Sequence, residues 1–271
     1  RIGAYHGSTH LAIAMTTPLY SEGWDSANDQ VHHLRSPHFW REGDGMTEEA
    51  FLDALVEDLE TSIERIGAEN IAAFIAEPIM GAGGVIVAPE GYHVRMAKVC
   101  AANEIKYISD EVVTAFGRLG HFFASKDVFG ITPDIITTAK GLTSGYQPMS
   151  ATIVSDEIHE VISEPGGMFL HGMTYSGHPA SAAAGLANIA LMERDRLPEQ
   201  VRTTGKIFET ALRGLSDLDI VGEVRGSHFM IGIEFVKDKE KKTPFAPEDS
   251  IGLKIAQAAQ SRGLIARPLG N

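Results

Sequence analysis

Cysteine is nearly absent from this sequence: of 271 residues, only Cys100 carries a thiol. A single thiol excludes a disulfide framework within the chain and a cysteine zinc site, and it favours a reducing, cytoplasmic location. Long hydrophobic runs are missing as well. Because a membrane-spanning helix needs about 18 or more consecutive apolar residues, the sequence predicts no membrane span.

Positive charge is also scarce, with 23 Lys and Arg against 36 Asp and Glu, which gives a formal net charge of -13. A surface of this sign repels nucleic-acid phosphates and anionic lipid headgroups. The sequence therefore disfavours nucleic acid and membrane surfaces as partners. What remains, 44% hydrophobic and 22% charged residues, is typical of a globular protein.

Histidine is not scarce, yet the 11 histidines do not form a metal-binding pattern. Neither His6 with His10 nor His32 with His33 has a carboxylate or cysteine companion at ligand spacing, so we predict no metal site. The glycine-rich run 81–84 departs from the Gly-x-Gly-x-x-Gly pattern of dinucleotide-binding loops, and we interpret it as a tight turn.

Short apolar runs alternate with helical patterns in the first half of the chain. Thr47 is a good N-cap for a helix that ends at Gly67, and a second helix is predicted over 92–103. The apolar runs are 71–76, 105–109 and 135–139. This alternation predicts an α/β fold with a mostly parallel sheet and helices on both of its faces.

Each predicted strand ends on an ionisable residue: Glu77, Asp110 and Lys140. Ligands of open parallel sheets bind beyond the carboxyl ends of the strands, so these side chains are expected to converge on one crevice.

The second half changes character. A long Ala- and Gly-rich helix is predicted over 178–197, two strands over 221–236, a helix over 250–262 and a strand over 264–267. Charged residues 237–242 are typical of a solvated hairpin tip. We therefore predict a large domain over 1–200 and a partial α+β C-terminal domain over 201–271. Both ends of the sequence read as cut from a longer chain.

Lys140 and Asp110 form a candidate pair for chemistry. A lysine forms a Schiff base with a carbonyl cofactor when a dry, rigid position keeps it neutral, and a strand end followed by Gly141 is expected to supply one. A carboxylate at a second strand end can hold a proton on a pyridine nitrogen. The ring then withdraws electrons from the substrate carbon.

Two long segments carry a family resemblance. Residues 108–118 (ISDEVVTAFGR) and 134–142 (DIITTAKGL) resemble the signature of class III aminotransferases in residue types and in spacing. The segments AYHG (4–7), AEP (76–78) and HGMTYSGHP (171–179) also resemble this family. The last one is similar to the ω-amino acid and amine:pyruvate branch. The resemblance implies the fold-type-I large domain of pyridoxal-phosphate-dependent transferases.

The resemblance also implies site residues. Lys140 would carry pyridoxal 5′-phosphate and act as general acid and base, and Asp110 would pair with the pyridinium nitrogen. The remaining cofactor-binding residues would be Tyr5 and Val112 on opposite ring faces, His6 beside Tyr5, Glu77 near the ring hydroxyl, and Thr174, whose hydroxyl would reach the phosphate of a neighbouring subunit. Arg267 resembles the mobile arginine that binds a substrate carboxylate.

The implied activity is transfer of an amino group from an ω-amino acid or amine to a keto acid, with pyruvate as the expected acceptor. Because each site would borrow Thr174, a homodimer or higher homo-oligomer is expected. Two alternatives stay open: an aminomutase, racemase or decarboxylase of the same fold, or an inactive fragment that serves as an assembly module. The second is motivated by the family's main phosphate-binding Gly-Ser/Thr loop, which would lie upstream of Arg1. Ala115 replaces a glycine that many members carry.

Overall fold

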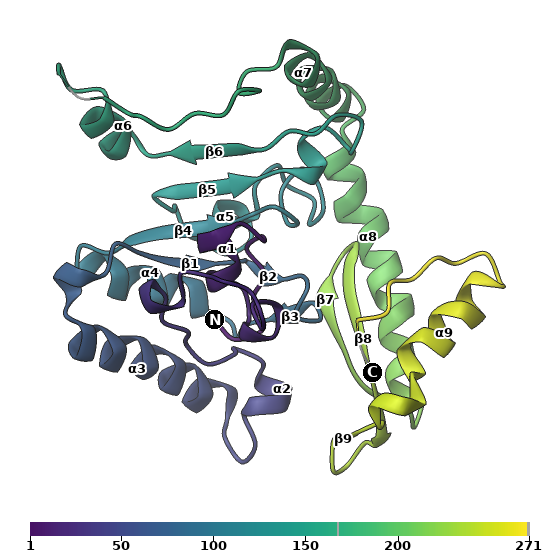
Figure 1. Cartoon of the computed structure of the whole chain (residues 1–271). Coiled ribbons are helices and arrows are strands. Elements are labelled where there is room, and N and C mark those ends of the chain that lie inside the picture. Colours follow the sequence, from purple (N-terminus) through teal and green to yellow (C-terminus); the bar gives the residue numbers. More distant parts are fainter. Residues whose placement is uncertain (167, 270–271) are drawn as a thin grey trace. The chain divides into compact units, whose positions relative to one another are not determined.

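The computed structural model describes residues 1–166 and 168–269 (Figure 1). The chain divides into two compact units. One, here called the sheet unit, comprises Leu52–Pro78 and Glu90–Thr204; the other, the hairpin unit, comprises Arg1–Phe51, Ile79–Pro89 and Gly205–Asn271. The division at residue 200 into a large and a small domain stays a prediction.

The sheet unit contains a four-stranded sheet with the order β1-β4-β5-β6. Strands β1, β4 and β5 run parallel, and β6 pairs with β5 in the antiparallel direction. The fold is therefore α/β with a mostly parallel sheet, as predicted. The elements are α3 (Glu48–Ile66, which begins in the hairpin unit), β1 (Ala73–Ala76), α4 (Tyr92–Ala102), β4 (Lys106–Asp110), α5 (Ala124–Asp127), β5 (Ile135–Thr138), β6 (Ala151–Val154), α6 (Asp156–Ile162), α7 (Pro179–Arg194) and α8 (Leu197–Arg213, which ends in the hairpin unit).

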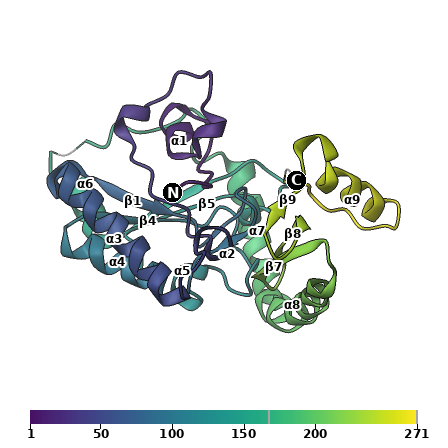
Figure 2. The same ribbon diagram turned by 90° about the horizontal axis from the view of Figure 1, so that it is seen from below.

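Helix α3 follows from its caps and its apolar periodicity. The Thr47 hydroxyl accepts a hydrogen bond from the Ala50 amide at 3.2 Å, and Gly67 ends the helix with a φ of +88°, a conformation that glycine adopts readily. Leu55 and Leu59 on its apolar face are buried. Helices α3 and α4 lie side by side (Figure 2), and Arg95 of α4 forms an ion pair with Asp53 of α3.

The predicted helix over 178–197 is confirmed as α7, which ends slightly earlier than predicted. Helix α7 ends at Arg194, Arg196 adopts a left-handed conformation with a φ of +50°, and a separate helix, α8, begins at Leu197. Neither α8 nor the antiparallel strand β6 was predicted. Because a left-handed residue cannot continue an α-helix, the direction of the chain changes at this point.

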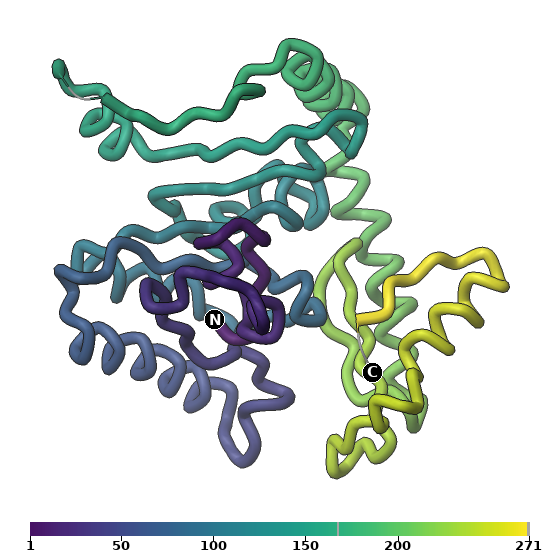
Figure 3. The backbone as a smooth tube through the Cα atoms, viewed as in Figure 1, coloured from purple at the N-terminus to yellow at the C-terminus, as the bar shows by residue number. Residues whose placement is uncertain are grey.

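The segment between α6 and α7 exposes apolar side chains. Residues 168–173 form neither helix nor strand, and a turn over 174–177 follows before α7 begins (Figure 3). Met168, Leu170 and Tyr175 are 77%, 85% and 80% exposed. Such a concentration of exposed large apolar side chains is typical of a surface that another chain covers.

The hairpin unit is built on an antiparallel sheet with the order β7-β8-β9, in which β7 (Val221–Ser227) and β8 (Met230–Asp238) form a long hairpin. These two strands confirm the prediction for 221–236. Helix α9 (Ile251–Gln260) confirms the predicted helix over 250–262. The other elements are α1 (His10–Met15), α2 (Phe39–Glu42), β2 (Ile79–Met80), β3 (Ile86–Val87) and β9 (Thr243–Pro244).

The predicted strand over 264–267 is wrong. These residues are exposed and have no regular secondary structure. A strand forms only where a neighbouring strand accepts its backbone hydrogen bonds, and in the described chain none of the strands pairs with this segment. Among the described residues, no helix combines the length and the apolar character that crossing a bilayer requires.

Candidate active site at the strand ends

The carboxyl ends of three adjacent parallel strands carry the ionisable residues singled out from the sequence. Ala76 pairs with Ser109 across β1 and β4, so Glu77 lies level with Asp110. Asp110 in turn pairs with Thr137 of β5, and Lys140 lies just beyond the end of that strand. Neighbouring strands are about 4.8 Å apart. The three backbone positions therefore lie at one sheet edge, and the convergence of their side chains on one crevice stays a prediction.

Asp110 occupies a buried, ordered position. Its side chain accepts a hydrogen bond from the Val112 amide at 3.1 Å, and the residue is 5% exposed. Glu77, on the neighbouring strand end, is also buried. The Glu111 amide donates to the Thr137 carbonyl at 2.8 Å, which continues the ladder between β4 and β5 past Asp110. The Val112 amide thus holds the Asp110 carboxylate, and the bond from the Glu111 amide holds the backbone beside it.

Glu111, next to Asp110, is fully buried and fully bonded. Its carboxylate accepts hydrogen bonds from the amides of Ala124 and Ser125 at 2.7 and 2.9 Å and from the Thr114 hydroxyl at 3.1 Å. A carboxylate with this many donors is stable in a protein interior. Glu111 therefore fixes the start of α5 against the end of β4.

Lys140 differs from the expectation of a dry amine, because the residue is exposed. No ion-pair or hydrogen-bond partner of its amine is found in the part of the chain that the structure describes. Its backbone is in the left-handed region, with a φ of +39°. Non-glycine residues in this region cost free energy and concentrate at functional sites.

Close packing holds the turn that follows Lys140. A Cβ atom at Gly141 would lie 2.8 Å from the Phe116 Cβ atom, so no larger residue fits without a shift. Phe116 itself has a φ of +55°. On the other side, Asn188 of α7 donates hydrogen bonds from its amide to the carbonyls of Gly141 and Leu142 at 2.9 and 3.1 Å.

Comparison with known proteins identifies this arrangement. The sequence model of the family described as aminotransferase class-III matches residues 2–271, which is nearly the whole chain. The chain belongs to the class-III aminotransferase family.

This class-III chain is similar to several aminotransferases over its whole length. It is 40% identical over 276 residues to gamma aminobutyrate transaminase 1, mitochondrial, of Solanum lycopersicum, covering 100% of this chain and 53% of the relative. It is 39% identical to the putrescine–pyruvate aminotransferase of Pseudomonas aeruginosa, covering 100% and 59%. The solved structure of the omega transaminase from Pseudomonas jessenii in complex with PMP matches with a TM-score of 0.95 and 38% identity, over 100% of this chain and 60% of that one.

This class-III chain thus spans 53% to 60% of the length of these relatives. Pyridoxal 5′-phosphate, the expected cofactor, agrees with the family, because its aminated form PMP is bound in one solved relative. The residues at the strand ends suit such a group: a buried carboxylate and an accessible amine lie on neighbouring strand ends.

The other predicted site residues of the class-III chain are dispersed. Val112 is half-buried two residues after Asp110, and Thr174 is exposed in the turn that precedes α7. Tyr5, His6 and Arg267 belong to the hairpin unit.

Within that unit, the Tyr5 ring packs edge-on against Tyr20 at 5.5 Å, and the His6 amide donates to the Thr16 hydroxyl at 2.9 Å. Arg267 is exposed, in the segment where a strand was wrongly predicted.

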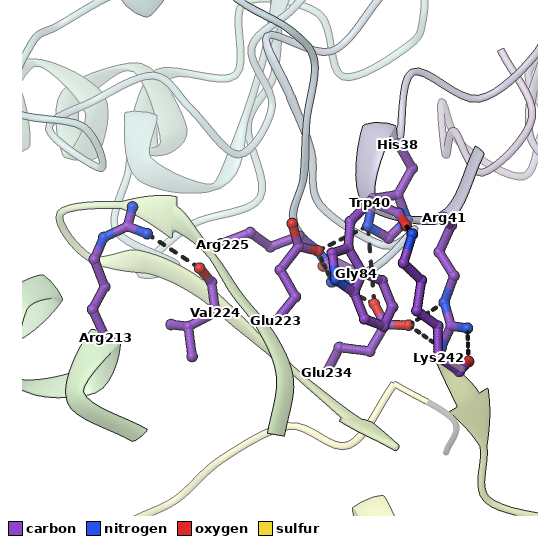
Figure 4. A network of polar contacts seen from close by, with 10 residues as sticks. All are labelled: His38, Trp40, Arg41, Gly84, Arg213, Glu223, Val224, Arg225, Glu234 and Lys242. Atoms are coloured by element: carbon purple, nitrogen blue, oxygen red, sulfur yellow. Dashed lines mark hydrogen bonds and ion pairs between the residues drawn. The ribbon is translucent and has the colours of Figure 1, made fainter. Parts of the chain in front are cut away.

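A second cluster of charged side chains lies within the hairpin unit, here called the polar network (Figure 4). Arg225 bonds to both Glu223 and Glu234 and donates to the Gly84 carbonyl at 2.8 Å. His38 contacts Glu223 at 2.9 Å, and Arg41 donates to Glu234 at 2.6 Å. Segments far apart in the sequence are joined in this way.

His38, Glu223 and Glu234 in the polar network have the ligand spacing of a metal site, but their charge is already neutralised. Arg225 and Arg41 supply two positive charges against the two carboxylates. A cation placed there would face the Arg225 guanidinium at close range. We therefore assign the polar network to folding and not to metal binding.

Sequence reasoning missed Asn188 and the role of Glu111. Asn188 is a lone amide in an Ala-rich helix, and only that contrast with its neighbours could have drawn attention to it. Glu111 lay inside the signature segment, yet its bonds reach residues of α5 that no spacing rule connects to it.

Proposed function

We propose that this chain carries the lysine and the carboxylate of a pyridoxal-phosphate site in an aminotransferase. The observation that carries the proposal is the arrangement of Glu77, Asp110 and Lys140 on three adjacent parallel strand ends. In parallel α/β sheets this edge is where ligands bind. Membership of the class-III family supports the cofactor.

Lys140 would hold the cofactor covalently through its exposed amine, and Asp110 would pair with the ring nitrogen. Val112 and Tyr5 would lie against the ring faces, with His6 beside Tyr5 and Glu77 near the ring hydroxyl. When bound, the cofactor supplies a positively charged ring that withdraws electrons from the substrate carbon.

Asp110 would pair with the protonated ring nitrogen, and the hydrogen bond from the Val112 amide would hold its carboxylate in place. Lys140, released when the substrate amine takes its place, would act as general acid and base and carry a proton from the substrate carbon to the cofactor. Its exposed position gives the amine room for both tasks, and the bound cofactor would itself cover the amine from water.

For the substrates, we propose an ω-amino acid or amine as donor and a keto acid, pyruvate first, as acceptor. The named relatives support both donor classes, since one acts on gamma aminobutyrate and another on putrescine with pyruvate. Arg267 would bind the substrate carboxylate, and its exposure leaves its guanidinium free to move.

We propose a homodimer in which Thr174 reaches the phosphate bound by the second copy. Thr174 is exposed, and it follows a segment whose apolar side chains are exposed as well. A cytoplasmic location stays a prediction that rests on the single cysteine.

The covalent link to Lys140 can be tested directly. The chain is incubated with pyridoxal phosphate, treated with borohydride to make the link permanent, digested, and analysed by mass spectrometry. We expect one modified peptide that contains Lys140, and the yellow absorbance of the bound cofactor before reduction. Lys140→Ala should lose both signals, because no other amine follows this strand end.

Lys126→Ala is the matched control, since Lys126 is also an exposed lysine of the sheet unit. It should retain the modified peptide. A parent chain that shows neither colour nor a specifically modified lysine would overturn the proposal and favour the assembly-module alternative. Modification that persists in Lys140→Ala would contradict the assignment of this lysine.

The reaction type is tested with the cofactor-loaded chain and a panel of amine donors, with and without pyruvate. Aminotransfer requires an acceptor, so alanine should form only when donor and pyruvate are both present. Conversion of a single substrate without any acceptor would instead indicate an aminomutase, racemase or decarboxylase.

A further inference from the structure

Asn188 uses its whole side chain to hold the turn after Lys140. Its Nδ2 atom donates to the Gly141 and Leu142 carbonyls at 2.9 and 3.1 Å, and its Oδ1 atom accepts from the Ser144 hydroxyl at 2.8 Å. These bonds join residues more than 40 positions apart in the sequence. Nothing on the remainder of α7 makes a comparable set of bonds to this turn in the described chain.

The turn needs such a restraint because its backbone is strained. Both Lys140 and Ser144 have positive φ values, +39° and +51°. Its own main-chain hydrogen bonds are uneven: the Leu142 amide donates to the Ala139 carbonyl at 2.9 Å, but the amides of Thr143 and Ser144 donate to the carbonyls of Lys140 and Gly141 at 3.3 Å. Residues in this region persist where surrounding contacts overdetermine them.

Helix α7 is placed to act as that restraint. Gly185, three residues before Asn188 and therefore on the same helix face, is buried. A Cβ atom at Gly185 would lie 3.2 Å from the Met149 Sδ atom, so the small residue allows close approach of the helix. Helix packing and hydrogen bonds together thus fix the position of Asn188 beside the turn.

We propose that Asn188 is a positioning residue that holds the Lys140 turn in the conformation from which the lysine binds the cofactor. This inference rests on the proposed function of Lys140. Asn188 touches no reacting atom; it acts through the carbonyls of Gly141 and Leu142. An amide is required because the position needs two donors and one acceptor on one planar group.

Asn188→Asp is the sharpest variant, because it keeps the shape and replaces the two donors by a carboxylate that repels both carbonyls. Asn188→Ala removes the group without adding charge, and it guards against misfolding caused by that charge. Asn103→Asp is the matched control: the Asn103 Nδ2 atom donates to the Val99 carbonyl at 2.8 Å at the end of α4, away from the strand ends.

Two measurements are made on each variant. Hydrogen exchange of the cofactor-free chain measures how fast the amide protons of Leu142, Thr143 and Ser144 exchange with solvent. Borohydride trapping at a series of pyridoxal phosphate concentrations gives the half-loading concentration, at which Lys140 is modified in half of the chains. We expect faster exchange in both Asn188 variants. The half-loading concentration should rise about tenfold, as the loss of two hydrogen bonds implies, while Asn103→Asp changes neither measurement.

The outcomes separate the two proposals. Faster exchange with unchanged loading would show that Asn188 stabilises the turn without affecting cofactor binding, and it would overturn the positioning role. Unchanged exchange would overturn the claim that Asn188 holds the turn. A parent chain that takes up no cofactor would overturn the proposed function, and the positioning role with it. In that case the exchange data would still show whether the turn depends on Asn188.

Discussion

The polar network of the hairpin unit and the strand ends of the sheet unit both gather charged side chains, yet they treat charge in opposite ways. In the network every charge has an opposite partner: Arg225 bonds to Glu223 and Glu234, and Arg41 to Glu234. At the strand ends, the Lys140 amine is exposed and has no partner in the described part of the chain.

The backbone shows the same contrast. Glu223, Arg225 and Glu234 of the network lie on the paired strands β7 and β8, whereas Lys140 and Phe116 have positive φ values. A charge that is paired on a strand stabilises the fold. An unpaired charge on strained backbone reduces stability but remains available for a reaction. The comparison indicates that chemistry is expected where an unpaired charge coincides with a strained backbone at a strand end.

The largest effect is expected in the network. Arg225→Ala leaves Glu223 and Glu234 without their shared partner in a site where the Arg225 side chain is only 11% exposed. Breaking a buried pair in this way costs about 3–5 kcal/mol. Urea unfolding followed by the fluorescence of Trp24 and Trp40, both in the hairpin unit, should report the loss, because the Arg41 guanidinium lies 4.5 Å from the Trp40 ring.

Lys241→Ala is the control in the same unit, since Lys241 pairs with Asp238 while its side chain is 79% exposed. Its urea midpoint should match that of the parent. An Arg225→Ala chain with an unchanged midpoint would end the assignment of the network to stability.

A smaller, pH-dependent effect is expected for Glu223. Burial raises the pKa of Glu223, but hydrogen bonds from His38 and Arg225 outweigh it and hold the pKa below its ordinary value of 4.5. The unfolded chain therefore binds this proton more readily. The contribution of Glu223 to stability is complete above pH 4.5 and is lost as the pH falls through the lowered pKa.

Glu223→Gln should then be less stable than the parent by about 2 kcal/mol at neutral pH, the value of hydrogen bonds to a charged group. The gap between the two chains should narrow as the pH is lowered in urea titrations. A gap that stays constant through the acid range would show that the Glu223 charge does not support the network.

The smallest effect is expected at the strand ends and has the opposite sign. Lys140→Gly relieves the left-handed strain that Lys140→Ala retains, so the glycine variant should be more stable by about 1 kcal/mol. Labelling of Cys100 in urea reports unfolding of the sheet unit. Burial first, and then the nearby charge of Asp134, raise the pKa of this thiol to about 12 in the folded chain.

Both Lys140 variants lack the amine, so loss of the cofactor is common to them and does not affect the comparison. If the alanine variant proved as stable as the glycine variant, the turn would not be strained at this residue.

The positions of the strand ends could be predicted from the sequence because each of the signals for them is local. Short apolar runs stop at Glu77, Asp110 and Lys140, and parallel pairing then brings their ends to one edge without further information. The capped helix α3 and the hairpin of β7 and β8 were predictable for the same reason: caps, periodicity and turn residues lie within the elements they define.

What the sequence could not supply depends on contacts between distant segments. The exposure of Lys140 was missed because a strand-end position was taken to imply cover, and no described side chain covers this amine. The strand predicted over 264–267 failed because apolar character does not provide a partner strand. Asn188 escaped attention because its bonds to Gly141 and Leu142 arise only when α7 packs beside the turn.

The buried state of Cys100 has a practical consequence. Because the only thiol of the chain is 1% exposed and stays protonated at neutral pH, a cysteine introduced at the surface would be the sole reactive thiol of the folded molecule. The natural sequence is thus already a suitable background for site-specific spin labels or fluorophores. Such labels, one in each unit, would allow distances between the units to be measured without first removing a native cysteine.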